Sequence, residues 1–279
     1  MANQIVVGAA DSDAGRRAVQ WAADRAEAHR QPLLLIGVVG GATGAVGESE
    51  FLNATIDATA ATLEELAAPL RERGLTVEVR AQAGNPVNVL IDASKDAAVL
   101  VIGSDYLGPG HGPARGSHGV RIAAAAHSPV IVVPDTDAGN RSGVVVGVDG
   151  SEVSEAATRF AAQEADRLGE RLIAVTVWTP VPLPRHISAY PLEYVESMEA
   201  VSAETLGVAL GGLRQDFPDL QIEERVERGY PSEIINEIAG TARMIVVGSH
   251  GRGAVARFLL GSISHEVLAR LATVTAVVR

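Results

Sequence analysis

Short runs of aliphatic and β-branched residues alternate along the chain with longer segments whose apolar residues follow helical spacing. Segments 14–29 and 154–168 show this helical spacing clearly. Aliphatic runs of this kind are typical of strands buried on both faces. Alternation of such strands with helices predicts an α/β fold with open parallel sheets and right-handed crossovers. The predicted strands lie near residues 3–9, 33–39, 75–81, 99–103 and 130–133, and again near 143–148, 171–178, 220–227, 244–248 and 274–278.

The second half of the chain repeats the first. Ile5–Gly8 matches Val144–Gly147 at an offset of 139 residues, and Gly84–Pro86 corresponds to Gly229–Pro231 at an offset of 145. The six additional residues of the second copy fall in the proline-rich segment Thr179–Pro191. Because the correspondence is sustained over the whole chain, we interpret it as a duplication of one strand–helix unit.

Length and composition agree with two domains. A chain of 279 residues exceeds the usual size of one compact core. We predict domains at 1–134 and 143–279, joined by the polar linker Pro134–Ser142, which contains proline and glycine. Hydrophobic residues make up 47% and aromatic residues only 4%. The cores must therefore be built from Val, Ile, Leu and Ala.

Charge and targeting signals narrow the choice of partners. The formal net charge is −11, with −6 in residues 1–140 and −5 in residues 141–279. An evenly acidic protein repels phosphate backbones and anionic lipids, so we expect neither nucleic acid nor membrane as a partner. No apolar run is long enough for a membrane span, and the start lacks a signal-peptide pattern. We therefore expect a soluble, cytoplasmic protein; the absence of cysteine excludes thiol chemistry and disulfides.

Two segments of the second copy carry candidate chemistry. Asp149-Gly150-Ser151 follows its first predicted strand, and its fourth strand runs into a segment with the spacing Gly-x2-Gly-x9-Gly-Ser. Ligands of open parallel sheets bind beyond the carboxyl ends of the strands. Glycine lets backbone approach a ligand closely, and the helix start at Gly261-Ser262 offers amide groups to an anion. The combination predicts a phosphate site.

Simpler explanations exist for the same residues. Ser262 could serve only as a helix N-cap, and Asp149 could only cap the turn that follows it. Arg252 could point to solvent, and His250 and His265 could be polar residues at a solvent edge. The glycine-rich segment 40–47 is better interpreted as a surface connection, since no suitable helix start follows it.

Together, the Gly-x2-Gly-x9-Gly-Ser spacing, the Val148-Asp-Gly-Ser151 sequence and the Gly-x-Pro before the third helix resemble the ATP-binding branch of the universal stress protein family. The resemblance covers both halves. It implies that each half is an adenine nucleotide alpha hydrolase-like, or Rossmann-like, domain of five parallel strands in the order 3-2-1-4-5. It also implies an internal pseudo-dimer, because the final strands of such domains commonly pair; here these are 130–133 and 275–278, which could instead pair in a homodimer.

The same resemblance assigns roles in an adenine-nucleotide site. Asp149, with Gly150 and Ser151 beside it, corresponds to the acid on the ribose and adenine side, and the backbone near Val177 to the contact with the base. His250 and Arg252 lie within the loop. The phosphate-loop positions correspond to Gly248, Gly251, Gly261, Ser262, Ile263 and Ser264.

The first copy departs from this pattern. Gly103, Gly116 and Ser117 match, but Tyr106 replaces the middle glycine and Ala10 replaces the acid. Loss of one charge-assisted hydrogen bond alone costs roughly 1.5–3 kcal/mol, or about 10- to 150-fold in affinity. Asp11 could substitute in part. We predict weak or absent nucleotide binding in the first copy.

Several other classes are excluded by their missing motifs. The only lysine is Lys95, so a Walker A loop is absent, and neither first strand is followed by Gly-x-Gly-x-x-Gly. No HExxH or clustered histidine pattern predicts a metal site, and no Gly-x-Ser-x-Gly predicts a serine hydrolase.

The sequence thus predicts a stress-response regulator or signalling module that binds ATP, with or without Mg²⁺, and has no catalytic residues. A slow ATPase and an assembly module without ligand are the alternatives. The physiological signal and the protein partner are not specified by the sequence.

Overall fold

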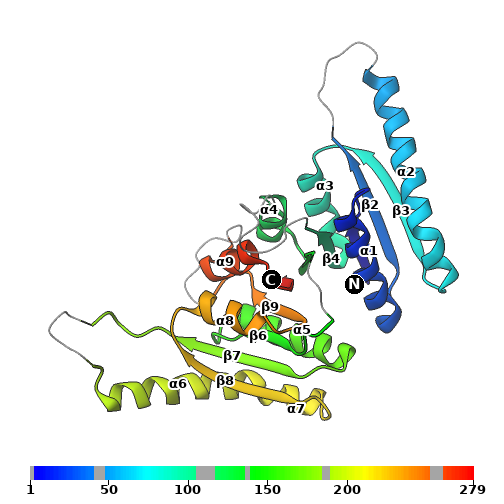
Figure 1. The fold of residues 1–279 in the computed structure, drawn as a ribbon. Helices are drawn as coiled ribbons and strands as arrows, with labels where there is room; N and C mark the ends of the chain where they lie inside the picture. Colours follow the sequence, from blue (N-terminus) through cyan, green and yellow to red (C-terminus); the bar gives the residue numbers. More distant parts are fainter. Residues whose placement is uncertain (1–2, 41–47, 105–116, 136–138, 184–188, 252–259) are drawn as a thin grey trace. The chain divides into compact units, whose positions relative to one another are not determined.

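The chain forms two compact units, Met1–Thr136 and Asp137–Arg279 (Figure 1). The computed structural model describes residues 3–40, 48–104, 117–135, 139–183, 189–251 and 260–279. Each unit is an α/β domain with parallel strands.

The sheet of the first unit has the order β3-β2-β1-β4-β5, and its paired strands are parallel. Right-handed crossovers in this order place α1 and α2 on one face and α3 and α4 on the other. The elements are β1 (Gln4–Gly8), α1 (Asp13–His29), β2 (Leu33–Val39), α2 (Glu48–Glu72), β3 (Val77–Ala83), α3 (Pro86–Ala93), η1 (Ser94–Asp96), β4 (Ala97–Gly103), α4 (Ser117–Ala125) and β5 (Val130–Val133).

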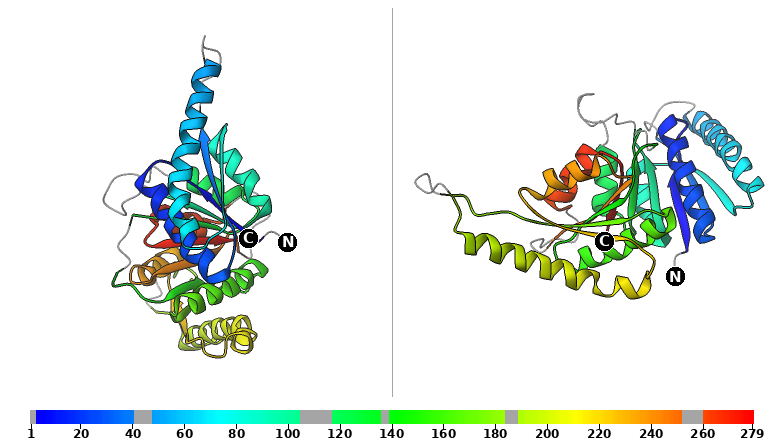
Figure 2. Two further views of the ribbon diagram at one scale, coloured as in Figure 1. Left: turned by 90° about the vertical axis from the view of Figure 1, so that its right-hand side faces the viewer. Right: turned by 60° about the horizontal axis from the view of Figure 1, so that its bottom comes forward.

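The second unit repeats this arrangement with the strand order β8-β7-β6-β9-β10. Its helix α6 runs along β7 and β8, as two views show (Figures 1 and 2). The elements are β6 (Val144–Gly147), α5 (Glu152–Leu168), β7 (Leu172–Trp178), α6 (Leu192–Gly211), α7 (Leu213–Asp216), β8 (Ile222–Arg228), α8 (Pro231–Ala239), β9 (Met244–Gly248), α9 (Ser262–Arg270) and β10 (Val274–Val278).

The predicted α/β class and the strand order 3-2-1-4-5 within each half are confirmed. Central strands such as β1 and β9 are buried along their aliphatic residues, as expected where helices cover both faces. The strands β3 and β8 each begin two residues later than expected. Both lie at an end of their strand order, and their sequences, VEVRAQA and IEERVER, mix charged with apolar residues.

The described residues contain neither a candidate membrane span nor a candidate metal cluster. Among them no helix is both long and apolar enough to cross a membrane. The same part of the chain contains no group of three or more His, Asp or Glu side chains arranged to hold a metal ion.

Candidate functional site

The turn between β6 and α5 is organised by the carboxylate of Asp149. Its Oδ1 accepts hydrogen bonds from the backbone N–H of Ser151 at 2.9 Å and from the Ser151 hydroxyl at 2.6 Å. The Ser151 Oγ in turn accepts from the backbone N–H of Ser154 at 3.2 Å and caps α5. Gly150, at φ +75°, makes the turn possible, because few other residues adopt this conformation readily. Asp149 therefore does cap the turn, through one of its two oxygens.

The second oxygen of Asp149 faces the loop that follows β9. A Cβ placed on Gly251 would lie 2.3 Å from Asp149 Oδ2. The two predicted halves of the site, which are about a hundred residues apart in sequence, are thus in close contact at the carboxyl ends of β6 and β9. Only glycine at position 251 permits this approach.

Gly261, at the start of α9, lies next to Ser249 and His250, which directly follow β9. Ser249 N–H donates to the Val278 carbonyl at 2.6 Å, and Gly261 N–H donates to the Ser249 carbonyl at 2.7 Å. A Cβ on Gly261 would approach the Cα of His250 to 3.2 Å. The His250 ring is held by a hydrogen bond of 2.9 Å between its Nδ1 and the Ser249 hydroxyl. These contacts bring the beginning of α9 next to the end of β9; Arg252 lies outside the described residues.

The helix α9 begins without a side-chain cap. Gly261 occupies the N-cap position, with φ −61° and ψ 153°, and supplies no side-chain cap hydrogen bond. The simpler explanation that Ser262 is the N-cap is therefore wrong; Ser262 is the first helical residue and is exposed. The N–H groups of Ser262, Ile263 and Ser264 have no partner within the helix, because the first turn of any α-helix leaves its amides unpaired. Such a helix start attracts anions.

Two of the predicted phosphate-loop residues, Gly248 and Ser264, make structural contacts within the unit. The buried Ser264 donates its hydroxyl hydrogen bond to the carbonyl of Gly248 and so ties α9 to β9. A Cβ on Gly248 would lie 2.9 Å from Cγ1 of Val153, so this glycine lets the first turn of α5 approach β9. The corresponding Gly103 of the first unit has the same role, since its Cβ would lie 2.0 Å from the carbonyl oxygen of Ala14.

Val177 lies near the carboxyl end of β7, half-buried and in register with Glu227 of β8. The next residue, Trp178, is buried and makes an edge-to-face contact with Tyr194 of α6 at 6.1 Å between ring centroids. Tyr194 is also stacked with Tyr190 at 5.6 Å. The aromatic group therefore fixes the end of β7, where the base contact is predicted.

One polar network beside this site has no signature in the sequence. Glu266 of α9 accepts hydrogen bonds from the Ser232 hydroxyl and, at 3.3 Å, from the Tyr230 hydroxyl, both at the start of α8. The negative charge of Glu266, with some desolvation, raises the pKa of Tyr230 above its usual value. Because these groups are more than 30 residues apart in sequence, no local motif reveals them. The network holds α8 against α9.

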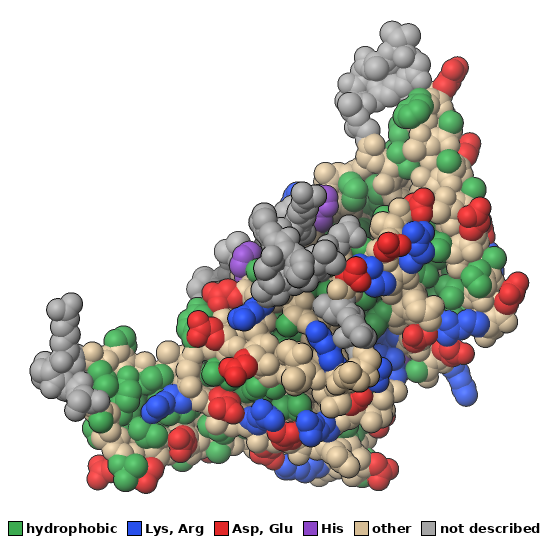
Figure 3. Space-filling view, in the orientation of Figure 1, with side chains coloured by type: hydrophobic (Ala, Val, Ile, Leu, Met, Phe, Trp, Pro, Cys, Tyr) green, Lys and Arg blue, Asp and Glu red, His purple; other side chains and the backbone are tan. Residues whose placement is uncertain are grey.

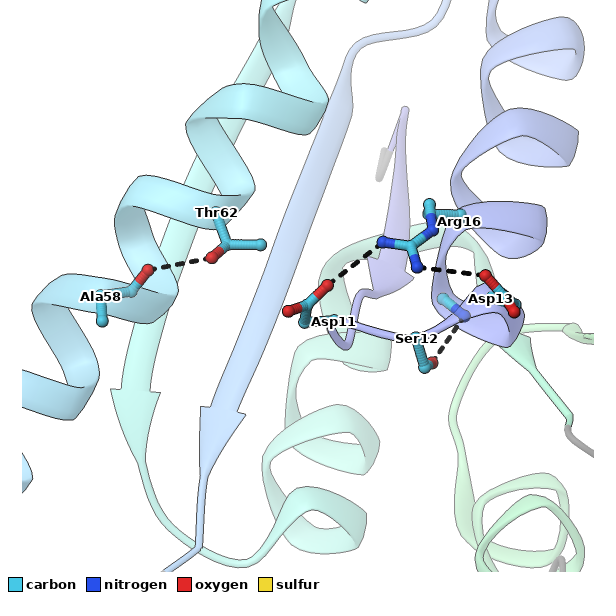
Figure 4. Close-up of polar contacts among 7 residues, drawn as sticks. Asp11, Ser12, Asp13, Arg16, Ala58 and Thr62 are labelled. Atoms are coloured by element: carbon cyan, nitrogen blue, oxygen red, sulfur yellow. Dashed lines mark hydrogen bonds and ion pairs between the residues drawn. The ribbon is translucent and has the colours of Figure 1, made fainter.

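The corresponding loop of the first unit is different (Figure 4). Asp11 points to the surface and pairs with Arg16 at 3.2 Å, and Arg16 also pairs with Asp13 at 3.1 Å. Ser12 caps α1 as Ser151 caps α5. Each unit therefore has its own serine N-cap, whereas the first unit has Ala10 at the position that corresponds to Asp149. Tyr106 and Gly116 lie outside the described residues.

Fold and loop geometry define a tandem protein of two doubly wound α/β domains, with polar turns at the carboxyl ends of the strands. The sequence profile of the Universal stress protein family matches residues 1–134 and 141–279. The chain belongs to the universal stress protein family.

Relatives and solved structures agree with this assignment. A universal stress protein of Mycolicibacterium smegmatis is 33% identical over 287 residues, covering 99% of this chain and 96% of the relative. One from Mycobacterium tuberculosis H37Rv is 32% identical over 291 residues, covering 98% and 95%. The crystal structure of a universal stress protein from Archaeoglobus fulgidus has a TM-score of 0.71 at 20% identity, covering 100% of this chain and 99% of that one, which supports the fold.

Proposed function

We propose that the second unit binds an adenine nucleotide, ATP, at the carboxyl ends of β6, β7 and β9, and that the protein acts as a nucleotide-dependent regulator in a stress response. The observation that carries the proposal is the close approach of Asp149 to Gly251 after β9, together with the start of α9, where the N-cap residue Gly261 supplies no side-chain cap. A carboxylate that accepts ribose hydroxyls and a helix start that binds phosphate are thereby presented by one continuous set of loops.

The residues have distinct roles in this proposal. Asp149 binds the ribose through Oδ2, while its Oδ1 stays engaged with Ser151. The backbone near Val177 contacts the base. The phosphates lie against the amides of Ser262, Ile263 and Ser264, with the Ser262 hydroxyl and His250 beside them. Gly251 and Gly261 allow the backbone to come close, and Gly248 and Ser264 hold the loop in place.

The first unit is proposed to bind weakly or not at all. Ala10 has no carboxylate to offer, and the carboxylate of Asp11 is already paired with Arg16 at the surface. Affinity for a ribose is therefore expected to fall by the value of one charge-assisted hydrogen bond, about 1.5–3 kcal/mol.

The direct test is to denature the purified protein, identify any nucleotide released, and titrate the emptied protein with ATP by calorimetry. One equivalent per chain is expected. Gly261→Glu should abolish binding, because its side chain brings a negative charge to the helix start and its Cβ approaches His250. Gly207→Glu on α6 is a matched control, since it adds the same charge at an exposed helical position where nothing lies within 4 Å of the Cβ. No heat with any adenine nucleotide would refute the proposal, and two tight equivalents would refute the assignment to one unit.

Binding rather than hydrolysis is proposed because the sequence of the second unit contains no lysine to neutralise a leaving phosphate; the chain's single lysine, Lys95, belongs to the first unit. Phosphate release from the purified protein distinguishes the two activities. Rapid Mg²⁺-dependent turnover that is lost in Gly261→Glu would show an ATPase.

A further inference from the structure

The outer side of α6 presents a second, exposed seam at coiled-coil spacing. Its buried side, through Leu206 and Leu210, covers the sheet of the second unit. The opposite side carries residues separated alternately by four and three positions, the spacing of a and d positions in a coiled coil. We call this set the outer seam; it consists of Ser197, Val201, Glu204, Val208 and Gly211, all of them exposed.

The apolar members of the outer seam are unusually accessible for their type. Val201 is 53% exposed and Val208 is 73% exposed, one heptad apart. Isolated apolar residues on a surface need no explanation, but two at a fixed heptad spacing form a stripe that another helix can cover. The neighbouring exposed residues Ala200 and Gly207 have small or absent side chains, which leaves room for close approach.

The charge of the helix selects the kind of partner. α6 contains four glutamates, at positions 193, 196, 199 and 204, and no basic residue. Figure 3 shows carboxylates next to apolar side chains over this part of the second unit. Glu204 lies at the centre of the outer seam itself, between the two valines. A helix that covers the seam must place a cation opposite this carboxylate, because like charges in contact are destabilising.

A second copy of α6 does not satisfy this condition. If two α6 helices packed in parallel, each residue of the outer seam would face the same residue of the other helix, so Glu204 would face Glu204. If they packed antiparallel with the centres of their seams aligned, Glu204 would again face Glu204. We propose that the outer seam of α6 is a docking surface for an amphipathic helix of a partner protein that carries Lys or Arg between its apolar anchors. The outer seam spans 15 helical positions, a length of about 21 Å at 1.5 Å per step, so the docking helix needs roughly 15 residues.

The test uses the full chain and two labelled peptides of 18 residues. Both peptides have leucine at the positions that face the two valines of the outer seam. One peptide has Lys at the position that faces Glu204 and at the flanking positions, and its twin has Glu at the same positions. Fluorescence anisotropy should show binding of the basic peptide and at least tenfold weaker binding of the acidic twin. Val201→Ser with Val208→Ser should weaken the basic peptide at least tenfold. Glu204→Lys should reverse the preference between the two peptides.

A matched control is Glu65→Lys on α2 of the first unit, which makes the same charge change at an exposed helical position and should leave the preference unchanged. Thermal melting checks that each variant is folded. The proposal is overturned if neither peptide binds, or if Glu204→Lys and Glu65→Lys shift the preference equally. It is also overturned if light scattering shows a dimer of the wild type that the valine variants dissociate, because the seam is then a contact between copies.

Discussion

The carboxylate of Asp149 occupies the space that a side chain on Gly251 would need, with Oδ2 only 2.3 Å from the position of the missing Cβ. This single relationship joins the loop after β6 to the loop after β9. It also explains the glycine in steric terms, since Gly251 is not among the residues with positive φ. An alanine there would adopt the backbone conformation without strain but would collide with the acid.

Gly251→Ala should therefore weaken ATP binding at least tenfold, because either the loop or the Asp149 carboxylate must move away. Calorimetric titration measures the effect. Gly207→Ala on α6 is the control: its Cβ meets nothing within 4 Å, and replacing a helical glycine should raise stability by about 0.5–1 kcal/mol without changing affinity. Equal affinities of Gly251→Ala and wild type would contradict the assigned site.

Asp149→Asn should lower the affinity for ATP by about 10- to 150-fold, the value of a charge-assisted hydrogen bond. The amide oxygen can still accept from Ser151, so the turn should stay folded. Asp11→Asn in the first unit should leave both affinity and stoichiometry unchanged, because Asp11 is engaged by Arg16 at the surface. If the two variants had the same effect, the distinction between the units would be wrong.

Ser264→Ala and Ser262→Ala should separate stability from binding. Loss of the buried Ser264 hydroxyl removes its hydrogen bond to Gly248 and should destabilise the second unit by about 1 kcal/mol. The exposed Ser262 makes no cap, so its removal should change stability by less than about 0.5 kcal/mol while weakening ATP binding. Urea unfolding followed by Trp178 fluorescence in a Trp21→Phe background reports on the second unit. The reverse ranking would show that Ser262 is the structural residue.

Glu266→Gln should lower the pKa of Tyr230, because the charge of Glu266 is the main cause of its elevation. A raised pKa in the folded state contributes stability that is fully present below the unfolded value near 10 and is lost as the pH rises through the folded pKa. Ultraviolet titration of the tyrosines, compared with Tyr230→Phe, identifies the relevant transition. An unchanged titration curve in Glu266→Gln would rule out this electrostatic coupling.

The regular part of the fold follows from local patterns. The strands β2, β5, β9 and β10 begin and end where they were predicted from their aliphatic runs, since burial on both faces leaves a sharp boundary in the sequence. The strands β3 and β8 were placed two residues too early, because strands at an end of the sheet tolerate charged residues and their limits are set by pairing with β2 and β7.

Only those candidate site residues that lie within short sequence motifs could be predicted. The glycine spacing and the Asp149 turn indicated two loops that the structure brings together, and the repeat placed both at the same sheet edge. What the spacing could not show is which glycine serves packing: Gly248 accommodates Val153, whereas Gly251 accommodates Asp149. The Glu266 network was also missed, because its members meet only through the packing of α8 on α9.

The sequence of β8, IEERVER, has a consequence for self-association. β8 ends the strand order of its unit and, among the described strands, pairs only with β7, so its other side is a sheet edge. Its charged side chains, among them Glu224 and Arg225, make the addition of an unrelated strand costly. The charged border thus disfavours the edge-to-edge addition of a further strand to a largely aliphatic sheet.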